Sequence, residues 1–237
     1  MAVLLLRLSG PLQSWDIQSR FQVRDTAREP SKSGVIGLLM AAMGCGRECS
    51  VEPLASLRMG VRVDQEGLML RDYHTTQNIR EASAEKVDLE RGAGVRSSVS
   101  TRYYLMDARF LVGLEGEDLA LLARLHAALK DPVWFLYLGR KACVPGEPIW
   151  LKDGLRPNQT LEEALCTYPW LGPEETWAKR RPERLRLVLE DPAGEQVRPD
   201  QPLSFAERRF APRRIHITFC KAPTACLEEV ERCTSLA

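Results

Sequence analysis

The sequence has few of the residues that usually form metal or disulfide sites. Its 237 residues include three histidines, and none of the seven cysteines is spaced Cys-x-x-Cys from another. A structural zinc site needs four closely spaced Cys or His ligands, so we expect no metal site and no cofactor. An odd number of cysteines without such spacing is typical of free thiols in a reducing compartment.

Long apolar runs and an excess of one charge are also absent. No segment approaches the roughly 20 apolar residues that a transmembrane helix needs, and residues 1–7 lack the basic region and cleavage motif of a signal peptide. We therefore expect a cytoplasmic protein without a membrane partner. Lys and Arg number 33 against 32 Asp and Glu, so any nucleic-acid binding must come from a local basic cluster.

Residues 30–44 predict a buried helix with a polar, cationic N-terminus. Ser31 or Ser33 can accept hydrogen bonds from the free amides of the first turn, and Gly44 suits a left-handed C-terminal stop. Apolar residues cover most of the circumference between them, so the helix must be packed. Lys32 adds a positive charge to the positive end of the helix dipole, which makes a phosphate site one reading and a capped core helix with an incidental lysine the other.

The segment before this helix is basic. Residues 3–8 predict a buried strand, and Arg20, Arg24 and Arg28 lie in the polar stretch that follows it. A strand, a basic loop and a helix N-terminus in this order favour a phosphate-binding edge. The alternative is a solvated surface loop.

The remaining pattern predicts an α+β protein. Residues 57–63, extended towards 71, and 101–114 predict strands, 117–129 an amphipathic helix and 133–138 a fourth strand. The order strand, helix, strand, strand, helix, strand is the ferredoxin-like βαββαβ unit, which we assign to residues 1–150. Residues 79–100 are polar and poor in large apolar residues, which predicts an inserted arm. Residues 151–237 are punctuated by prolines and predict a small, mostly β or irregular region.

Five short motifs occur in one order along the first 145 residues. They are LSGPLQSW at 8–15, PSKSG with GLL at 30–39, LRDYHT at 70–75, RYYLMDA at 102–108 and YLGRKAC at 137–143. Together they resemble the Cas5-type subunits of type I-E CRISPR surveillance complexes, called Cascade. The C-terminal part is matched by its length and by the FAER segment at 205–208.

The resemblance implies an RRM-like ferredoxin fold of the RAMP type. It also implies a role in antiviral defence in which the protein is not a catalyst. It implies that the protein holds the repeat-derived 5′ handle of the CRISPR RNA and caps one end of the complex. The arm at 76–100 would be a thumb that reaches the CasC backbone subunit. The CasA large subunit would be a neighbour, and target DNA would be met only indirectly, through the complex.

The expected RNA contacts combine cations for the phosphates with polar and aromatic side chains for the bases. The candidate RNA-binding residues are Arg20, Arg24, Arg28, Ser31, Lys32, Ser33, Arg71, Tyr73, His74, Arg102, Tyr104, Arg140 and Lys141. Trp15 is a further stacking candidate, with core packing as its alternative.

Two other functions stay open. Some Cas5-type relatives cut precursor RNA without metal, and Tyr73, His74 and Lys141 could supply the acid and base for that reaction. The sequence contains no carboxylate cluster that predicts a metal-dependent nuclease. A protein-only scaffold, with its basic residues merely solvated, is the second alternative.

Overall fold

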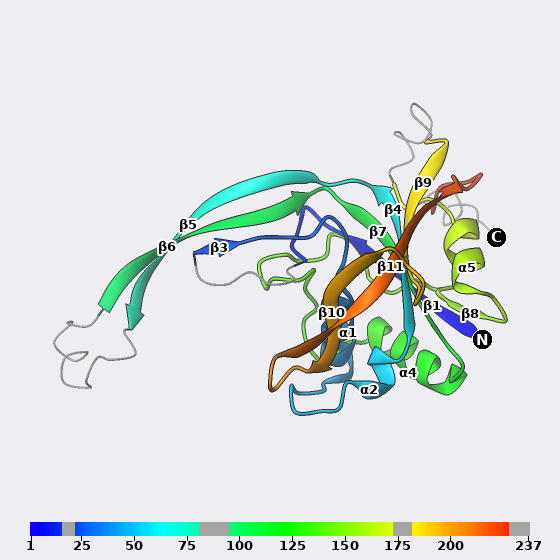
Figure 1. Ribbon diagram of the computed structural model, residues 1–237, viewed down its shortest axis with the longest axis horizontal. Helices are drawn as coiled ribbons and strands as arrows, with labels where there is room; N and C mark the ends of the chain where they lie inside the picture. The colour runs from blue at the N-terminus through cyan, green and yellow to red at the C-terminus, as the bar shows by residue number, and fades with distance from the viewer. Residues whose placement is uncertain (16–21, 81–94, 173–181, 228–237) are drawn as a thin grey trace.

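A seven-stranded antiparallel sheet forms the centre of the protein (Figure 1). The computed structural model describes residues 1–15, 22–80, 95–172 and 182–227. The strand order across the sheet is β10-β11-β9-β4-β7-β1-β8. The strands are β1 (Ala2–Ser9), β4 (Arg58–Gln65), β7 (Arg109–Gly116), β8 (Leu155–Pro157), β9 (Arg184–Glu190), β10 (Gln196–Ser204) and β11 (Arg209–Lys221).

Helices cover both faces of this sheet. Helices α1 (Lys32–Met43) and α4 (Leu119–Lys130) share a core with Leu4, Leu6 and Leu8 of β1, whereas α5 (Leu161–Thr167) shares a second core with Val3 and Leu5. Successive side chains of a strand point to opposite faces, so an unbroken apolar run such as β1 can be buried on both sides. A short helix, α2 (Glu52–Ala55), follows α1.

The caps of α1 agree with the sequence prediction. The Ser31 Oγ accepts from the Gly34 amide at 3.3 Å, which satisfies one free donor of the first turn. Gly44 ends the helix in the left-handed conformation, with φ of 71°. The apolar residues between them are buried as expected, including Val35, Ile36 and Leu39.

The α+β class is confirmed, and one strand was predicted in the wrong place. Strands β8, β1, β7 and β4 lie side by side, and α1 and α4 make the two connections. If these four strands are numbered by their order along the chain, their order across the sheet is fourth, first, third, second. The fourth strand is β8 and not residues 133–138, because Leu138 turns back to accept and donate backbone hydrogen bonds with Ser14 and Cys143. Those hydrogen bonds replace a strand ladder.

A two-stranded arm projects from one end of the sheet (Figure 1). It consists of β5 (Leu68–Arg80) and β6 (Val95–Met106), paired antiparallel, and residues 81–94 at its tip lie outside the described residues. The arm therefore begins at residue 68 and not at 76. The predicted strand 101–114 is two strands, because Asp107 adopts a left-handed φ of 55° between β6 and β7. On the far side of β6 lie the short strands β2 (Leu12–Gln13) and β3 (Val23–Arg24).

The C-terminal residues extend the same sheet. Strand β9 pairs with β4, and β11 pairs with β9 and β10. Strand β8 also lies beyond residue 150, so the main sheet crosses the boundary predicted there. Within the described ranges, no helix is long and apolar enough to cross a membrane, and no three His, Cys, Asp or Glu residues are grouped as they would be around a metal ion.

Candidate nucleic-acid interface

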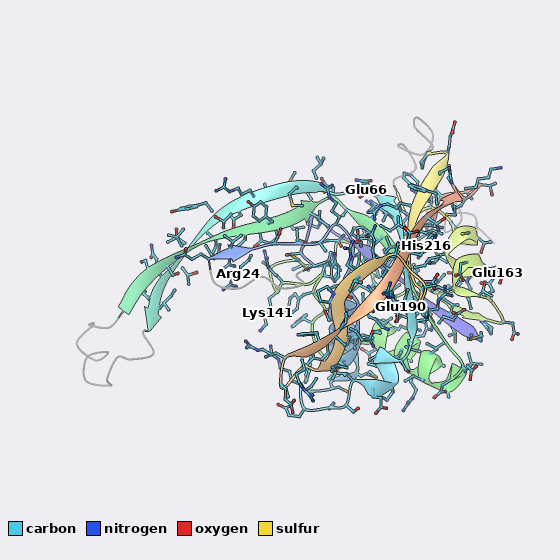
Figure 2. The ribbon with its side chains drawn as sticks, in the orientation of Figure 1. Arg24, Glu66, Lys141, Glu163, Glu190 and His216 are labelled. Atoms are coloured by element: carbon cyan, nitrogen blue, oxygen red, sulfur yellow. The ribbon has the colours of Figure 1, made fainter. Side chains whose placement is uncertain are left out.

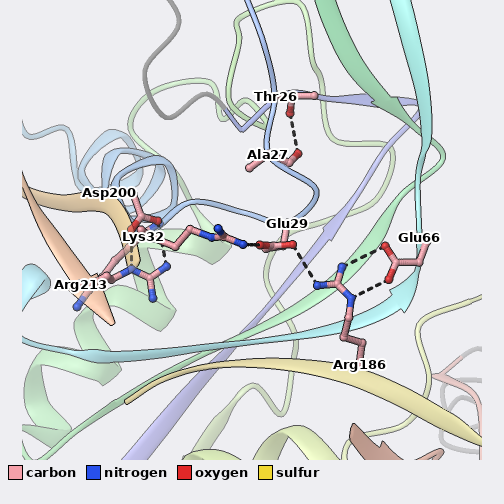
Figure 3. Close-up of polar contacts among 9 residues, drawn as sticks. Thr26, Ala27, Glu29, Lys32, Glu66, Arg186, Asp200 and Arg213 are labelled. Carbon is pink, nitrogen blue, oxygen red and sulfur yellow. Dashed lines mark hydrogen bonds and ion pairs between the residues drawn. The ribbon is translucent and has the colours of Figure 1, made fainter. Parts of the chain in front are cut away.

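The protein's own carboxylates occupy the N-terminus of α1, and Figure 3 shows one of them, Asp200, beside Lys32. The Lys32 ammonium is buried and donates to Glu190 Oε1 at 2.9 Å, and the Lys32 amide donates to Asp200 Oδ2 at 2.8 Å. Burial lowers the pKa of Lys32, and the Glu190 carboxylate opposes that shift. Both the charge and the amide are paired within the protein, which favours the capped-core alternative, and a phosphate contact at Lys32 stays a prediction.

A set of ion pairs holds the segment before α1 against the C-terminal strands. Glu29 accepts from Arg186 of β9 and from Arg198 of β10, each at 3.1 Å. Arg186 also pairs with Glu66, and Arg213 pairs with Asp200 through two hydrogen bonds (Figure 3). These arginines are neutralised inside the protein, so their role is structural. Of the two serines predicted to contact RNA, Ser31 already accepts a hydrogen bond from the Gly34 amide through its hydroxyl, and Ser33 is half-buried.

The motif at 137–143 forms a compact loop that carries two candidate cations. Gly139 has φ of 92°, and a Cβ there would lie 1.7 Å from the Ser14 carbonyl oxygen, so the loop requires glycine. The Arg140 guanidinium donates to the carbonyl oxygens of Tyr103, Arg24 and Asp25 at 2.9–3.1 Å. It therefore joins the loop to β6 and to the segment around β3.

Four cations lie where the loop at 137–143 meets β3 and β6. We call them the basic face and define it as Arg24, Arg102, Arg140 and Lys141. Arg24 and Lys141 are exposed, and they lie on the same side of the arm in Figure 2. Neither has an ion-pair partner among the described residues. Arg24 of β3 is the register partner of Arg102 on β6, and Arg102 is also the register partner of Asp72 on β5, so the positive charge of the face comes mainly from Arg24 and Lys141. The face therefore favours an anionic ligand.

Two further candidate cations, Arg28 and Arg20, are not part of this definition. Arg28 is exposed and has no ion-pair partner among the described residues. Arg20 lies outside the described residues, so its prediction stays a prediction.

The two faces of the arm differ in chemistry. Asp72 and His74 of β5 are paired in register with Arg102 and Ser100 of β6, and these four side chains share the face of Tyr104. The His74 Nδ1 lies 3.5 Å from Asp72 Oδ2, and Arg102 Nε donates to Ser100 Oγ at 3.1 Å. The opposite face carries the exposed Arg71 and Tyr73, of which Tyr73 is 70% exposed.

The three aromatic residues considered for base stacking differ in their exposure. Tyr104 is buried, and the Arg140 guanidinium lies 5.0 Å from its ring centroid, so this ring face is already occupied. Trp15 is also buried, and its indole donates to Gln13 Oε1, which assigns it to the core. Tyr73 alone of these three is free to stack on a base.

Sequence reasoning missed two features of this region. The first is that Arg140 organises the face by binding carbonyl oxygens, which no spacing in the sequence reports. The second is the Asp72–His74 pair. The i, i+2 spacing on a predicted strand was a signal for that pair, because alternate residues share a face.

The antiparallel sheet with helices on both faces and the projecting two-stranded arm define a mixed α+β protein. The family described as "CRISPR-associated protein (Cas_Cas5)" matches residues 3–216. The CRISPR system Cascade subunit CasD of Escherichia coli (strain K12) is 33% identical over 183 residues, which are 71% of this chain and 78% of that protein.

Two solved structures resemble the whole chain. One, described as "Crystal structure of Cas protein", has a TM-score of 0.72 and 46% identity, covering 93% of this chain and 97% of its own. The other, described as "CRISPR RNA-guided surveillance complex", has a TM-score of 0.75 and 30% identity, covering 97% of this chain and 96% of its own. The chain belongs to the Cas5 family of CRISPR-associated proteins.

Proposed function

We propose that this protein is a non-catalytic, CRISPR-RNA-binding subunit of a type I-E Cascade complex. In this proposal the unit β1-α1-β4-β7-α4-β8 is the ferredoxin-like module of the RAMP type, and its basic face holds the repeat-derived 5′ handle. The arm reaches the CasC backbone subunit, CasA is a neighbour, and target DNA is met through the assembled complex. Family membership and the likeness to a chain of a surveillance complex support the assignment.

The basic face is the observation that carries the proposal. Arg24 and Lys141 are exposed cations without ion-pair partners in the described parts of the chain, whereas Lys32, Arg186 and Arg213 are neutralised by carboxylates. Exposed, unpaired cations held at fixed positions suit phosphate oxygens, and phosphate contacts dominate the affinity of proteins for nucleic acids.

The Asp72–His74 pair favours a second candidate, a metal-independent ribonuclease. A histidine oriented by a carboxylate can act as a general base. Against it, Tyr73 and His74 are successive residues of β5 and point to opposite faces, so they cannot act on one phosphodiester together. We therefore retain the non-catalytic role and make cleavage an outcome of the test.

The test measures binding of a 5′-labelled cognate repeat RNA to the purified full chain at several salt concentrations. We expect Arg24→Ala/Lys141→Ala to weaken binding roughly tenfold at about 0.15 M salt, and to reduce the slope of log K against log salt by about 1.4 in magnitude, for two lost phosphate contacts. The matched control is Arg124→Ala/Lys152→Ala, which removes two exposed cations from α4 and the turn before β8.

The same RNA is then run on a denaturing gel. Intact RNA with the expected loss of affinity supports the handle-binding role. A discrete cut that His74→Ala abolishes would replace that role with the ribonuclease. Equal affinity of the double variant and its control would show that the basic face does not hold the RNA, and no RNA binding by the unchanged chain would indicate a scaffold that contacts only protein.

A further inference from the structure

A second surface feature lies beside the C-terminal half of α1, apart from the basic face. It is a groove of about 430 Å³ between α1, the Cys45–Arg47 turn, Trp134 and the β10–β11 turn. Its walls include the rings of Phe205 and Phe210, whose centroids are 6.3 Å apart in an edge-to-face arrangement. The FAER segment at 205–208 forms part of it, and the RNA-binding proposal gives this segment no task.

The floor of the groove is apolar and closely approachable. Helix α1 contributes Gly37, Met40 and Ala41 to it, and a Cβ on Gly37 would be 3.8 Å from the Phe205 ring. None of these three side chains offers a hydrogen-bonding group. A nucleobase needs partners for its polar edges, whereas an aliphatic or aromatic side chain of a protein does not. The floor therefore fits an apolar side chain better than a base.

Exposed apolar surface continues next to the groove. Trp134 is 48% exposed, and its neighbours Val133 and Phe135 are 64% and 86% exposed. Contiguous exposed apolar residues with aromatic members are typical of sites that bind another protein. The aliphatic Val133 offers an RNA strand neither a charge nor a ring to stack on, whereas an apolar protein side chain can cover it.

The rim of the groove is positive. Arg47 and Arg208 line it, both are exposed, and neither has an ion-pair partner among the described residues. Of the described lining residues none is acidic; Glu48 lies beside Gly46 at one edge, and Glu207 of the turn is paired with Arg209. Arg208 also holds a left-handed φ of 53°, which glycine would adopt at lower cost.

We propose that this groove binds a segment of a neighbouring protein subunit that presents an apolar anchor side chain flanked by Asp or Glu. The proposal rests on the proposed function in that it needs the chain to be part of a multi-subunit complex. The anchor lies between Trp134, Phe205 and Phe210, and the flanking carboxylates pair with Arg47 and Arg208. Aromatic and arginine residues are those that most often dominate binding energy at protein interfaces.

The test replaces Phe210 with the photo-crosslinking residue p-benzoylphenylalanine in the complete complex, assembled from this chain, its neighbouring subunits and the guide RNA. After irradiation, mass spectrometry identifies what is joined to position 210. We expect a peptide of another subunit with an acidic residue within about four positions of the crosslink, since that is one helical turn. A crosslink to RNA, to this chain alone or to nothing would overturn the proposal.

Variants test the chemistry of the groove. Arg47→Glu together with Arg208→Glu should reduce the crosslink yield roughly tenfold, because like charges then face the acidic segment. Arg208→Gly removes one cation, and it suits the φ of 53° at that position, so a lower yield for this variant cannot be assigned to misfolding. An unchanged yield in both variants would overturn the acidic character of the partner.

Two controls separate this proposal from the RNA-binding one. The crosslinker at Phe219, an exposed ring on β11 outside the groove, should not give the same peptide. The groove variants should bind repeat RNA as the unchanged chain does, whereas Arg24→Ala/Lys141→Ala should not. If the chain is absent from the purified complex, the proposed function is contradicted. If the chain is present but gives no crosslink from position 210, only the proposal for the groove is contradicted.

Discussion

Arg140 shows how one side chain can prepare a binding face without being its main ligand. Its guanidinium donates to three backbone carbonyl oxygens and covers the ring of Tyr104. The contacts join the backbone at Arg24 to the loop that carries Lys141. The planar, multi-donor geometry of arginine is what allows one residue to serve three acceptors.

We therefore expect Arg140→Lys to fail as a conservative change. A lysine has no planar fork and cannot reach three carbonyl groups at once, so the free energy of unfolding should fall by roughly 1–2 kcal/mol. RNA affinity should fall as well, although the charge is kept. Urea unfolding and the RNA-binding assay measure the two effects, with Arg124→Lys on α4 as the control. Unchanged affinity would mean that Arg140 does not organise the basic face.

At the scale of elements, α5 is attached to the sheet by charged side chains. The buried Arg62 of β4 pairs with Asp64 and donates to the carbonyl oxygens of Leu165 and Tyr168 at the end of the helix. At the start of the helix, which Thr160 and Glu163 close with a capping box, the Leu161 amide donates to Glu115 Oε1 of β7 at 2.9 Å. The helix is thereby held at both ends, and only its apolar face contacts the second core.

The partly exposed ion pair between Arg58 and Glu162, near the start of α5, makes the stability of the protein depend on pH in the acid range. Hydrogen bonds from Arg58 lower the pKa of Glu162 below its ordinary value near 4.5, against a smaller effect of burial. The folded state then binds fewer protons than the unfolded state, so the stabilisation is complete above that ordinary value and is lost as pH falls through the lowered pKa. Glu115 also contacts Arg58, and Arg58 donates to the Glu190 carbonyl oxygen.

Glu162→Gln should accordingly lower the free energy of unfolding by less than about 1 kcal/mol at neutral pH, because solvent screens a pair with this exposure. As pH falls through the lowered pKa of Glu162, the variant and the unchanged chain should differ less and less, since the carboxylate becomes protonated. Urea unfolding across this pH range is the measurement. Glu117→Gln, at an exposed glutamate before α4, is the control. A difference that grows towards acid pH would contradict the argument.

At the scale of the whole molecule, the N-terminal unit and the C-terminal strands share one core. Val188 of β9 and Ile215 of β11 belong to the same apolar cluster as α1 and α4. The buried charge of Lys32 is neutralised by Glu190, so removing the C-terminal strands would leave that charge without its partner.

A fragment of residues 1–150 should therefore not fold alone. It lacks β8 and β9–β11 and exposes the apolar surface that they cover. The full chain should unfold in a single cooperative transition by circular dichroism and by tryptophan fluorescence, because its sheet is continuous. Two separate transitions, or a folded fragment with dispersed amide resonances, would instead establish the boundary near residue 150 as a domain boundary.

Much of the local structure follows from the sequence by itself. Apolar periodicity predicted β1, α1 and α4, and Ser31 and Gly44 predicted the ends of α1, because caps and periodicity depend on neighbouring residues. The arm was predicted, but its first eight residues, 68–75, were not included in it. Short strands were less predictable: β8 has three residues, and its pairing with β1 is what makes it a strand.

Only the tertiary structure decided which cations remain free. Lys32 was the first candidate for phosphate by its place at a helix N-terminus, yet Glu190 and Asp200, which occupy that place, are 158 and 168 residues away along the chain. Arg24 and Lys141 had weaker local signals and remain exposed without ion pairs in the described chain. Whether a charge is neutralised depends on its neighbours in space, and a single sequence reports only its neighbours along the chain.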